Sequence, residues 1–279
     1  MALRGIEELL GLQDQDAGGC DNMMNMIPVV GEVSNPKDWV HLASDLDLVI
    51  DLAGGSADVK TLSVGNLEAV ASTAQATRPS HAPKLNYIYT SGTWVHGDNR
   101  TDVVTDSTPL RKPAELVAWR PESEQKIITD QRVNGIVIRP ALLYGRDGSL
   151  LSSLFKSAAD GFVRWPGTPG GRYALIHVDD LADLYVRAAE KAPIIHGIIL
   201  DAVNEYSESA DDVLQALAKV AGAKGYEYTK PQNLYETALS TTSLIRPYLA
   251  RTLLDWRPLK PGLVDGMQVY YAAWKAAQK

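Results

Sequence analysis

Residues 85–98 read LNYIYTSGTWVHGD, and this stretch decides the fold. It begins with alternating apolar residues and passes, without a helical turn, into small hydroxylated residues and glycines. That order predicts a buried strand that delivers polar side chains at its C-terminal end. Open α/β sheets bind their ligands at this end of their strands. The stretch therefore predicts both a central strand and the location of a site.

Two further stretches repeat this pattern on either side of the first. They read LDLVIDLAGG at residues 46–55 and GIVIRPALLYG at residues 135–145, and each closes on glycine. Helix-length segments separate the three apolar runs. Strands that alternate with helices form βαβ units, so the sequence predicts an α/β fold built on a parallel sheet.

The composition limits the classes of protein to which the chain can belong. With 279 residues, of which 45% are hydrophobic, it can bury a sizeable core. It carries 27 basic and 34 acidic residues without a basic cluster, which argues against nucleic acid and membranes as partners. The single cysteine, Cys20, fits a reducing compartment, and neither an apolar run of roughly 18 residues nor a signal-peptide core is present. We therefore expect a soluble, cytoplasmic protein.

Periodicity and capping signals predict the remaining elements. Asn35 followed by Pro36 predicts the start of a helix. The other expected strands are 27–33 and 173–178, and the other expected helices are 6–12, 64–76, 150–159, 180–191, one after Ser209 and one that carries Met267 to Trp274. A helix over 115–131 has as its alternative a helix that begins near Pro121. Residues 98–113 are polar and rich in turn-forming residues, which predicts a surface loop.

Four motifs follow one another along the chain. They read VIDLAG at 49–54, YTSGTWVHG at 89–97, IRPALLYG at 138–145 and IHVDDLA at 176–182, and LLDWRP at 253–258 follows them. In order and spacing, from about residue 27 to residue 275, they resemble the extended and atypical short-chain dehydrogenase/reductase superfamily. The resemblance is to its NAD-dependent epimerase/dehydratase-like proteins in particular.

The resemblance implies a Rossmann-like, doubly wound parallel sheet, with NAD or NADP along its strand ends and a small-molecule substrate. It implies a single domain over residues 1–279, in which about 161–279 contribute a smaller substrate lobe. Such proteins receive the cofactor pyrophosphate on a Gly-x-x-Gly-x-x-Gly turn that opens the first helix. The start of the sequence lacks this motif, so we expect an N-terminally shortened sheet with 1–26 as an atypical segment. A homodimer through helices near residues 70 and 125 is also expected.

The catalytic pattern of these proteins is altered in the chain. They use a Tyr-x-x-x-Lys pair, in which the lysine lowers the tyrosine pKa and the tyrosine moves a proton. Alignment of Glu124 with the acid that commonly follows the lysine by four residues puts Arg120 at the lysine position and Leu116 at the tyrosine position. Arginine can still bind a ribose or a phosphate, but leucine cannot transfer a proton.

Gly92 stands where these proteins usually carry a catalytic Ser or Thr, and two hydroxyl residues flank it. The expected catalytic residues are Ser91, Thr93, Arg120 and Tyr144, and the expected cofactor-binding residues are Glu32, Val33, Ala53, Gly54, Arg120 and Pro140. Structural alternatives stay open for several of them. The two hydroxyls can satisfy backbone groups at a strand end, Glu32 can be a solvated carboxylate, and Tyr144 can be a core or wall aromatic.

The histidines add few candidates. The resemblance makes His177, Asp179 and Asp180 a strand end, a helix cap and an acidic first turn, which are structural roles. His96 could act as an acid or base near neutral pH, and Tyr144 and His96 are the candidate proton donors, but we expect His96 to be a loop histidine without a role. The five histidines lack metal-ligand spacing, so no metal is expected.

Two functions from different classes are consistent with the sequence. The first is an NAD(P)-dependent oxidoreductase or epimerase/dehydratase-like protein that acts on a small carbonyl or hydroxyl compound. The second is a catalytically inactive, Rossmann-like pseudoenzyme that serves as a binding or regulatory scaffold. The absent glycine motif, the absent tyrosine and the glycine at the usual hydroxyl position all favour the second.

Overall fold

The computed structural model of the chain describes residues 9–13, 26–54, 58–146 and 150–278. The chain forms two compact units, each assembled from three segments. The first unit consists of Met1–Thr90, Glu122–Val137 and Ala188–Ile198, and the second consists of Ser91–Pro121, Ile138–Arg187 and Ile199–Lys279.

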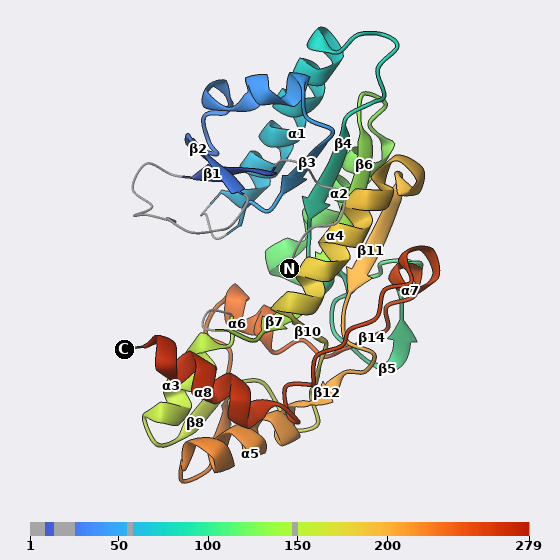
Figure 1. Cartoon of the computed structure of the whole chain (residues 1–279). Helices are drawn as coiled ribbons and strands as arrows, with labels where there is room; N and C mark the ends of the chain where they lie inside the picture. The colour runs from blue at the N-terminus through green and yellow to red at the C-terminus, as the bar shows by residue number, and fades with distance from the viewer. Residues whose placement is uncertain (1–8, 14–25, 55–57, 147–149, 279) are drawn as a thin grey trace. The chain divides into compact units, whose positions relative to one another are not determined.

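The main sheet has four strands in the order β11-β6-β4-β3 (Figure 1). Their bounds are Ile198–Ala202 for β11, Asn134–Pro140 for β6, Asn86–Thr90 for β4 and Leu48–Asp51 for β3. Strands β3 and β4 pair in parallel, with Leu48 opposite Asn86 and Asp51 opposite Tyr89. The three stretches that predicted strands thus supply β3, β4 and β6, and the expectation of an α/β fold with a parallel sheet is confirmed.

Strand β4 is buried on both of its faces. Tyr87, Ile88 and Tyr89 expose at most 1% of their surface. A buried hydroxyl needs a hydrogen-bond partner. The Tyr87 hydroxyl donates to Asp51 Oδ2 at 2.8 Å, and the Tyr89 hydroxyl lies 3.1 Å from Ser63 Oγ. These two bonds join β4 to β3 and to the helix α1.

Helix α1 (Val59–Thr77) begins directly after its N-cap residue, Asp58. Asp58 accepts a hydrogen bond from the Thr61 amide at 3.2 Å, which is the expected role of an N-cap carboxylate. The helix is longer than the predicted segment 64–76, because this cap lies upstream of the apolar face. Helix α2 (Arg120–Thr129) has Pro121 in its first turn, so the alternative helix near Pro121 is confirmed.

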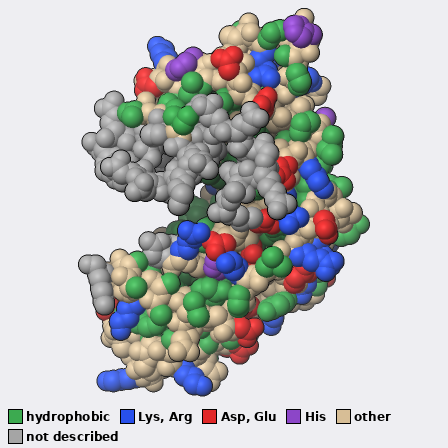
Figure 2. Space-filling model, viewed as in Figure 1, with side chains coloured by type: hydrophobic (Ala, Val, Ile, Leu, Met, Phe, Trp, Pro, Cys, Tyr) green, Lys and Arg blue, Asp and Glu red, His purple; other side chains and the backbone are tan. Residues whose placement is uncertain are grey.

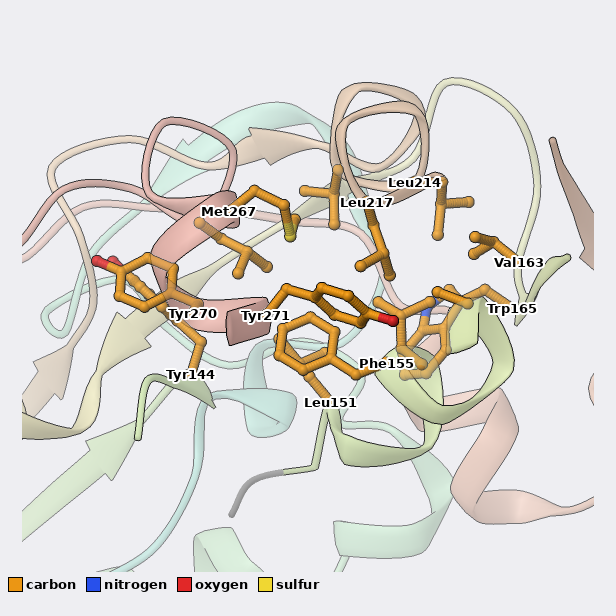
Figure 3. Packing of buried hydrophobic residues seen from close by; sticks show 14 of the residues in the cluster. Tyr144, Leu151, Phe155, Val163, Trp165, Leu214, Leu217, Met267, Tyr270 and Tyr271 are labelled. Carbon is orange, nitrogen blue, oxygen red and sulfur yellow. The ribbon is translucent and has the colours of Figure 1, made fainter. Parts of the chain in front are cut away.

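The second unit has its own hydrophobic core, which three helices and short strands enclose. The helices are α3 (Ser152–Ala159), α5 (Ala210–Ala221) and α8 (Met267–Ala277). Figure 3 shows Tyr144 and Tyr270 side by side at one end of this cluster, and Trp165 and Val163 at the other. Helix α5 carries a strong amphipathic pattern, and its cap Ser209 accepts from the Asp212 amide at 3.3 Å. The predicted helix after Ser209 is therefore confirmed.

The remaining elements are short except for the 18-residue helix α4. They are β1 (Leu9–Gln13), β2 (Met26–Val30), β5 (Asn99–Val104), β7 (Leu142–Tyr144), β8 (Val163–Pro166), β9 (Arg172–Tyr173), β10 (Leu175–His177), β12 (Glu208–Ser209), β13 (Tyr226–Thr229) and β14 (Ser243–Ile245), with the helices α4 (Val178–Ile195), α6 (Leu234–Leu239) and α7 (Leu249–Leu254). The 3-10 turns are η1 (Pro36–Asp38), η2 (Val40–Ser44), η3 (Thr93–His96) and η4 (Glu115–Val117). Strand β12 pairs with β9 in antiparallel, whereas β1–β2, β7–β10, β8–β13 and β5–β14 are parallel pairs.

Three sequence-based expectations were wrong. The part of segment 6–12 that the structure describes is strand β1, because its pairing with β2 outweighs the local pattern. The expected loop over 98–113 contains strand β5, whose partner β14 lies far along the chain. The helix predicted at Asn35 is a pair of 3-10 turns. The Asn35 side chain donates from Nδ2 to the Asp38 carboxylate at 3.0 Å and makes no cap hydrogen bond to the backbone.

Charges of both signs are interspersed on the face drawn in Figure 2. In the described parts of the chain, no helix is long and apolar enough to cross a membrane.

The Tyr87 hydrogen bond provides a test of the β3–β4 contact. We expect Tyr87→Phe to lower the free energy of unfolding by about 2 kcal/mol, because it removes a buried hydrogen bond to a carboxylate. Urea denaturation followed by circular dichroism measures this change. Tyr235→Phe, at a residue that is 39% exposed, is the matched control and should change stability by less than about 0.5 kcal/mol. Equal effects of the two substitutions would contradict the assignment.

Candidate functional site

In the first unit, the backbone turn after β3 is both fixed and bare. Asp51 Oδ1 accepts a hydrogen bond from the Ala53 amide at 2.9 Å, and Asp51 Oδ2 lies 3.4 Å from Asn66 Nδ2. Gly54 is exposed, and a Cβ added there would meet its nearest neighbour, the Leu52 carbonyl oxygen, at 3.8 Å. The buried Asp51 carboxylate therefore holds a turn whose backbone a ligand can approach closely.

Glu32 and Val33 follow β2 in the same unit. The Glu32 carbonyl accepts from Trp39 Nε1 at 3.1 Å and from the Asn35 amide at 2.9 Å. These bonds fix the backbone, while the Glu32 side chain is exposed and Val33 is half-buried. Their assignment to a cofactor stays a prediction.

In the second unit, the expected hydroxyl residues lie on the turn that follows β4. The Ser91 amide donates to the Ile138 carbonyl at 2.8 Å, so the turn continues the pairing with β6. Ser91 is 8% exposed and Thr93 is 5% exposed. A Cβ on Gly92 would lie 3.9 Å from the Pro140 carbonyl oxygen, which places the middle of the turn against the end of β6.

Thr93 also borders a small void. Its volume is about 10 Å³, which is close to the space that one water molecule needs. The other residues around it are Trp94, Leu142, Tyr173, Ala174, Leu239, Thr241 and Ser243. The wall combines hydroxyl groups with apolar side chains, and the space is of the size of a water molecule and not of a substrate.

Arg120 is the first residue of α2 and is half-buried. Its guanidinium carbon lies 4.9 Å from the centroid of the Trp119 ring, a cation–π distance. Leu116, at the expected tyrosine position, lies in the turn η4. The structure thus preserves a cation at the start of this helix and provides no proton donor at Leu116.

Tyr144 is a core residue. It is fully buried, its hydroxyl donates to the Pro261 carbonyl at 2.9 Å, and it accepts from Asn204 Nδ2 at 3.0 Å. Burial also raises the pKa of the Tyr144 hydroxyl well above its usual value. Of the two interpretations of Tyr144, the structure shows the core aromatic, and the hydroxyl is occupied.

The expectation for His96 was wrong. His96 is a buried residue with a specific partner: its Nε2 lies 2.8 Å from Asp201 Oδ2, and the two side chains are 2% and 0% exposed. The partner lies 105 positions away, so sequence spacing could not reveal the pair. One signal was available: Asp201 is a charged residue within the apolar strand IILDA. A buried aspartate in such a run requires a partner.

Two further charged groups adjoin this pair. Arg139 Nη1 lies 3.7 Å from Asp201 Oδ1, and the Asp201 amide lies 3.3 Å from Asp106 Oδ2. Burial, and then the nearby Asp201, raise the pKa of the Asp106 carboxyl to about 6, while backbone amides of Asp201 and Leu249 and the charge of Arg139 oppose the shift. The second unit therefore contains a buried cluster of His96, Arg139, Asp201 and Asp106, which we call the His96 cluster.

His177 ends a strand and Asp180 lies in the first turn of α4, as the resemblance implied, but Asp179 is not the helix cap: it also lies in the first turn, and the side chain that accepts a backbone amide there is that of His177. The Asp179 amide donates to His177 Nδ1 at 3.0 Å, and burial lowers the pKa of the His177 imidazole. The Asp180 carboxylate accepts from the backbone amides of Leu259 and Lys260, each at 3.0 Å. These bonds join the start of α4 to the segment after α7. Over the described ranges, no group of three or more His, Cys, Asp or Glu side chains could hold a metal ion.

Comparisons with known proteins support the fold. No protein-family model matches the sequence, and no curated protein matches it. Among solved structures, the dTDP-glucose 4,6-dehydratase of Bacillus anthracis in complex with NAD has a TM-score of 0.79 at 16% identity, covering 98% of this chain and 89% of that one. A double mutant of the dTDP-glucose 4,6-dehydratase DesIV from Streptomyces venezuelae has a TM-score of 0.74 at 14% identity, covering 91% and 81%.

A third similar structure is the UDP-glucuronic acid 4-epimerase of Bacillus cereus in complex with NAD. Its TM-score is 0.69 at 18% identity, and the match covers 92% of this chain and 83% of that one. The chain thus has the Rossmann-like fold of NAD-dependent epimerases and dehydratases. The resemblance seen in the sequence is confirmed at the level of the fold.

The approach of Gly145 to His177 gives a test of the strand ends β7 and β10. Gly145 has φ of +97°, and a Cβ there would overlap the His177 ring. Gly161 has φ of +95° but nothing within 4 Å of an added Cβ, so Gly161→Ala is a matched control for backbone strain. We expect Gly145→Ala to destabilise the protein by about 2 kcal/mol more than Gly161→Ala, measured by urea denaturation. Equal losses would mean that His177 moves aside freely.

The Asp106 carboxyl predicts a pH dependence of stability. Its pKa is about 6 in the folded protein against an ordinary 3.8, so the folded state binds the proton more tightly and loses stability as pH rises through this window. The expected contribution is at most about 3 kcal/mol between pH 4 and pH 6. Asp106→Asn should remove this contribution, seen as the difference between urea denaturation series of the two proteins. Parallel pH curves would rule out the assignment.

Proposed function

We propose that the protein is an NAD(P)-dependent oxidoreductase or epimerase/dehydratase-like enzyme that acts on a small carbonyl or hydroxyl compound. The observation that carries the proposal is the bare turn after β3, where the Asp51 carboxylate fixes Ala53 and leaves Gly54 exposed. Close backbone approach at a strand end is what dinucleotide sites in such sheets require. Structures with the same fold are described as complexes with NAD.

The residues present fit part of a dinucleotide site. In the first unit, Ala53 and Gly54 offer a bare backbone that suits a dinucleotide. Separately, in the second unit, the Arg120 guanidinium is a group that can bind a ribose hydroxyl or a phosphate oxygen. A bound nicotinamide would supply hydride acceptance or donation. The hydroxyls of Ser91 and Thr93 can orient a substrate oxygen by hydrogen bonding, once the substrate reaches them on the turn after β4.

A binding scaffold without catalysis is the second candidate, and specific observations favour it. Leu116 replaces the usual tyrosine, and the Tyr144 hydroxyl is committed to the Pro261 carbonyl and to Asn204. An enzyme of this class needs a proton donor within hydrogen-bond reach of its substrate. On this second hypothesis the protein binds a partner or a nucleotide and performs no proton transfer.

Fluorescence titration of NADH and NADPH into the full chain, followed by turnover assays, separates the two candidates. The first predicts saturable binding in the micromolar range. It also predicts that Arg120→Ala weakens binding by about tenfold or more, because a charged hydrogen bond is lost. Arg111→Ala is the matched control: Arg111 is 88% exposed, so its loss should leave affinity unchanged.

Absence of binding up to millimolar concentrations of both nucleotides would rule out the oxidoreductase and leave the scaffold. Binding without turnover of small aldehydes, ketones and alcohols would favour a nucleotide-binding scaffold. An effect of Arg111→Ala as large as that of Arg120→Ala would mean that general charge, and not a site at α2, attracts the nucleotide.

A further inference from the structure

His96 and Asp201 form a buried contact that lies outside the residues assigned to the proposed function. His96 is the last residue of η3, the turn that starts at Thr93, and Asp201 lies on β11. Their side chains are 2% and 0% exposed, and both belong to the second unit. A charged group is rarely buried to this extent without a specific partner.

The contact joins one nitrogen of the His96 ring to one oxygen of the Asp201 carboxyl group: His96 Nε2 lies 2.8 Å from Asp201 Oδ2. The other oxygen, Asp201 Oδ1, faces Arg139 Nη1 at 3.7 Å, and Asp106 approaches the Asp201 backbone amide. The His96 contact therefore engages one specific oxygen of a carboxyl group that lies against three other buried ionisable groups.

The turn that His96 ends begins with a long hydrogen bond. Gly92 precedes the turn without a side-chain cap, and the Val95 amide lies 3.5 Å from the Gly92 carbonyl oxygen. Farther along, the Trp94 carbonyl accepts from the Gly97 amide at 3.1 Å and from the Ala114 amide at 3.0 Å. The start of the turn is therefore the part to which a further attachment through His96 adds most.

Beyond His96 the chain is fixed by other contacts. Gly97 has φ of +70°, and a Cβ there would overlap the Lys112 carbonyl. The Ser243 hydroxyl donates to the Gly97 carbonyl at 2.9 Å, and the Thr242 amide donates to the Asp98 carboxylate at 2.8 Å. The side chain of His96 thus extends this firm attachment backward into η3, which begins at Thr93, two residues after Ser91.

We propose that His96 and Asp201 are positioning residues that hold the turn Thr93–His96, and with it the hydroxyls of Ser91 and Thr93, at the end of β4. The inference rests on the proposed function, since it assigns a task to the same hydroxyls. A hydroxyl orients a substrate only when its own position is fixed by the surrounding contacts. The bond runs from the turn after β4 to β11, which lies on the far side of β6 in the sheet.

Two amide variants test the inference. The glutamine side chain of His96→Gln can place an N–H near the position of His96 Nε2, whereas the asparagine side chain of His96→Asn is one methylene shorter and cannot reach Asp201. Hydrogen exchange of the backbone amides of residues 93–97 is measured by mass spectrometry, with 86–90 in β4 as the internal reference. We expect exchange in 93–97 to rise about tenfold or more in His96→Asn and less than about threefold in His96→Gln, with the reference unchanged.

Turnover of small aldehydes and ketones with NADH, measured for both variants, connects the turn to the substrate. We expect His96→Asn to lower kcat/KM by about fivefold to tenfold and His96→Gln to keep most of it, because the hydroxyls of Ser91 and Thr93 are proposed to orient the substrate. If the wild type is active and both variants are equally active, the positioning role is wrong. If the wild type shows neither NADH binding nor turnover but the exchange pattern appears, the contact holds the turn and the proposed function fails.

Two further outcomes overturn the inference. Equal exchange in the two variants would mean that a hydrogen-bond donor within reach of Asp201 does not hold the turn. A uniform rise across the whole second unit would make the pair an ordinary part of the core. If His96→Asn does not fold, Asp201→Asn replaces it: the amide keeps the size of the side chain and loses its charge, and exchange must rise in 93–97 and not in 86–90.

Discussion

The burial of β4 on both faces is the constraint on which the rest of the structure depends. A strand with no solvent-exposed face must find partners for every polar atom that it carries. Tyr87 and Tyr89 carry hydroxyls into this interior, and Asp51 and Ser63 receive them. Because Asp51 also binds the Ala53 amide, the same carboxylate that completes the interior shapes the turn at the surface. The Asp51 carboxylate thus contributes both to the packing of β4 against β3 and to the shape of the candidate cofactor turn.

Local patterns predicted the parts of the fold that local physics determines. Apolar runs that end in glycine gave β3, β4 and β6, and Ser209 marked the start of α5, because burial and capping act over a few residues. The strand β5 lies in a polar stretch, and only its pairing with β14, near the other end of the chain, makes it a strand. The polar Asn35 predicted a cap, yet its side chain found a nearer partner in Asp38.

The candidate site divides in the same way. Motif order predicted the turn residues Ser91 and Thr93 and the cation Arg120, and the structure places them at a strand end and a helix start. The His96 cluster remained hidden, because its members come from four separate segments and only Asp201, a charged residue in an apolar strand, gave a signal. Tyr144 illustrates the reverse case: its position in a motif drew attention to it, whereas its hydroxyl serves the core. Sequence patterns report proximity along the chain, and buried ionic groups depend on proximity in space.

The long-range bonds of the second unit also govern how it can form. The Asp98 carboxylate accepts a hydrogen bond from the Thr242 amide, 144 positions later in the chain. The Ser152 hydroxyl accepts one from the Trp274 indole, 122 positions later. Closing such loops costs chain entropy before any contact compensates for it, so this half of the protein assembles slowly. During synthesis, the apolar faces of β7 and α3 leave the ribosome well before α8 exists to cover them. Until α8 has been made, the apolar residues that it covers stay open to non-native contacts.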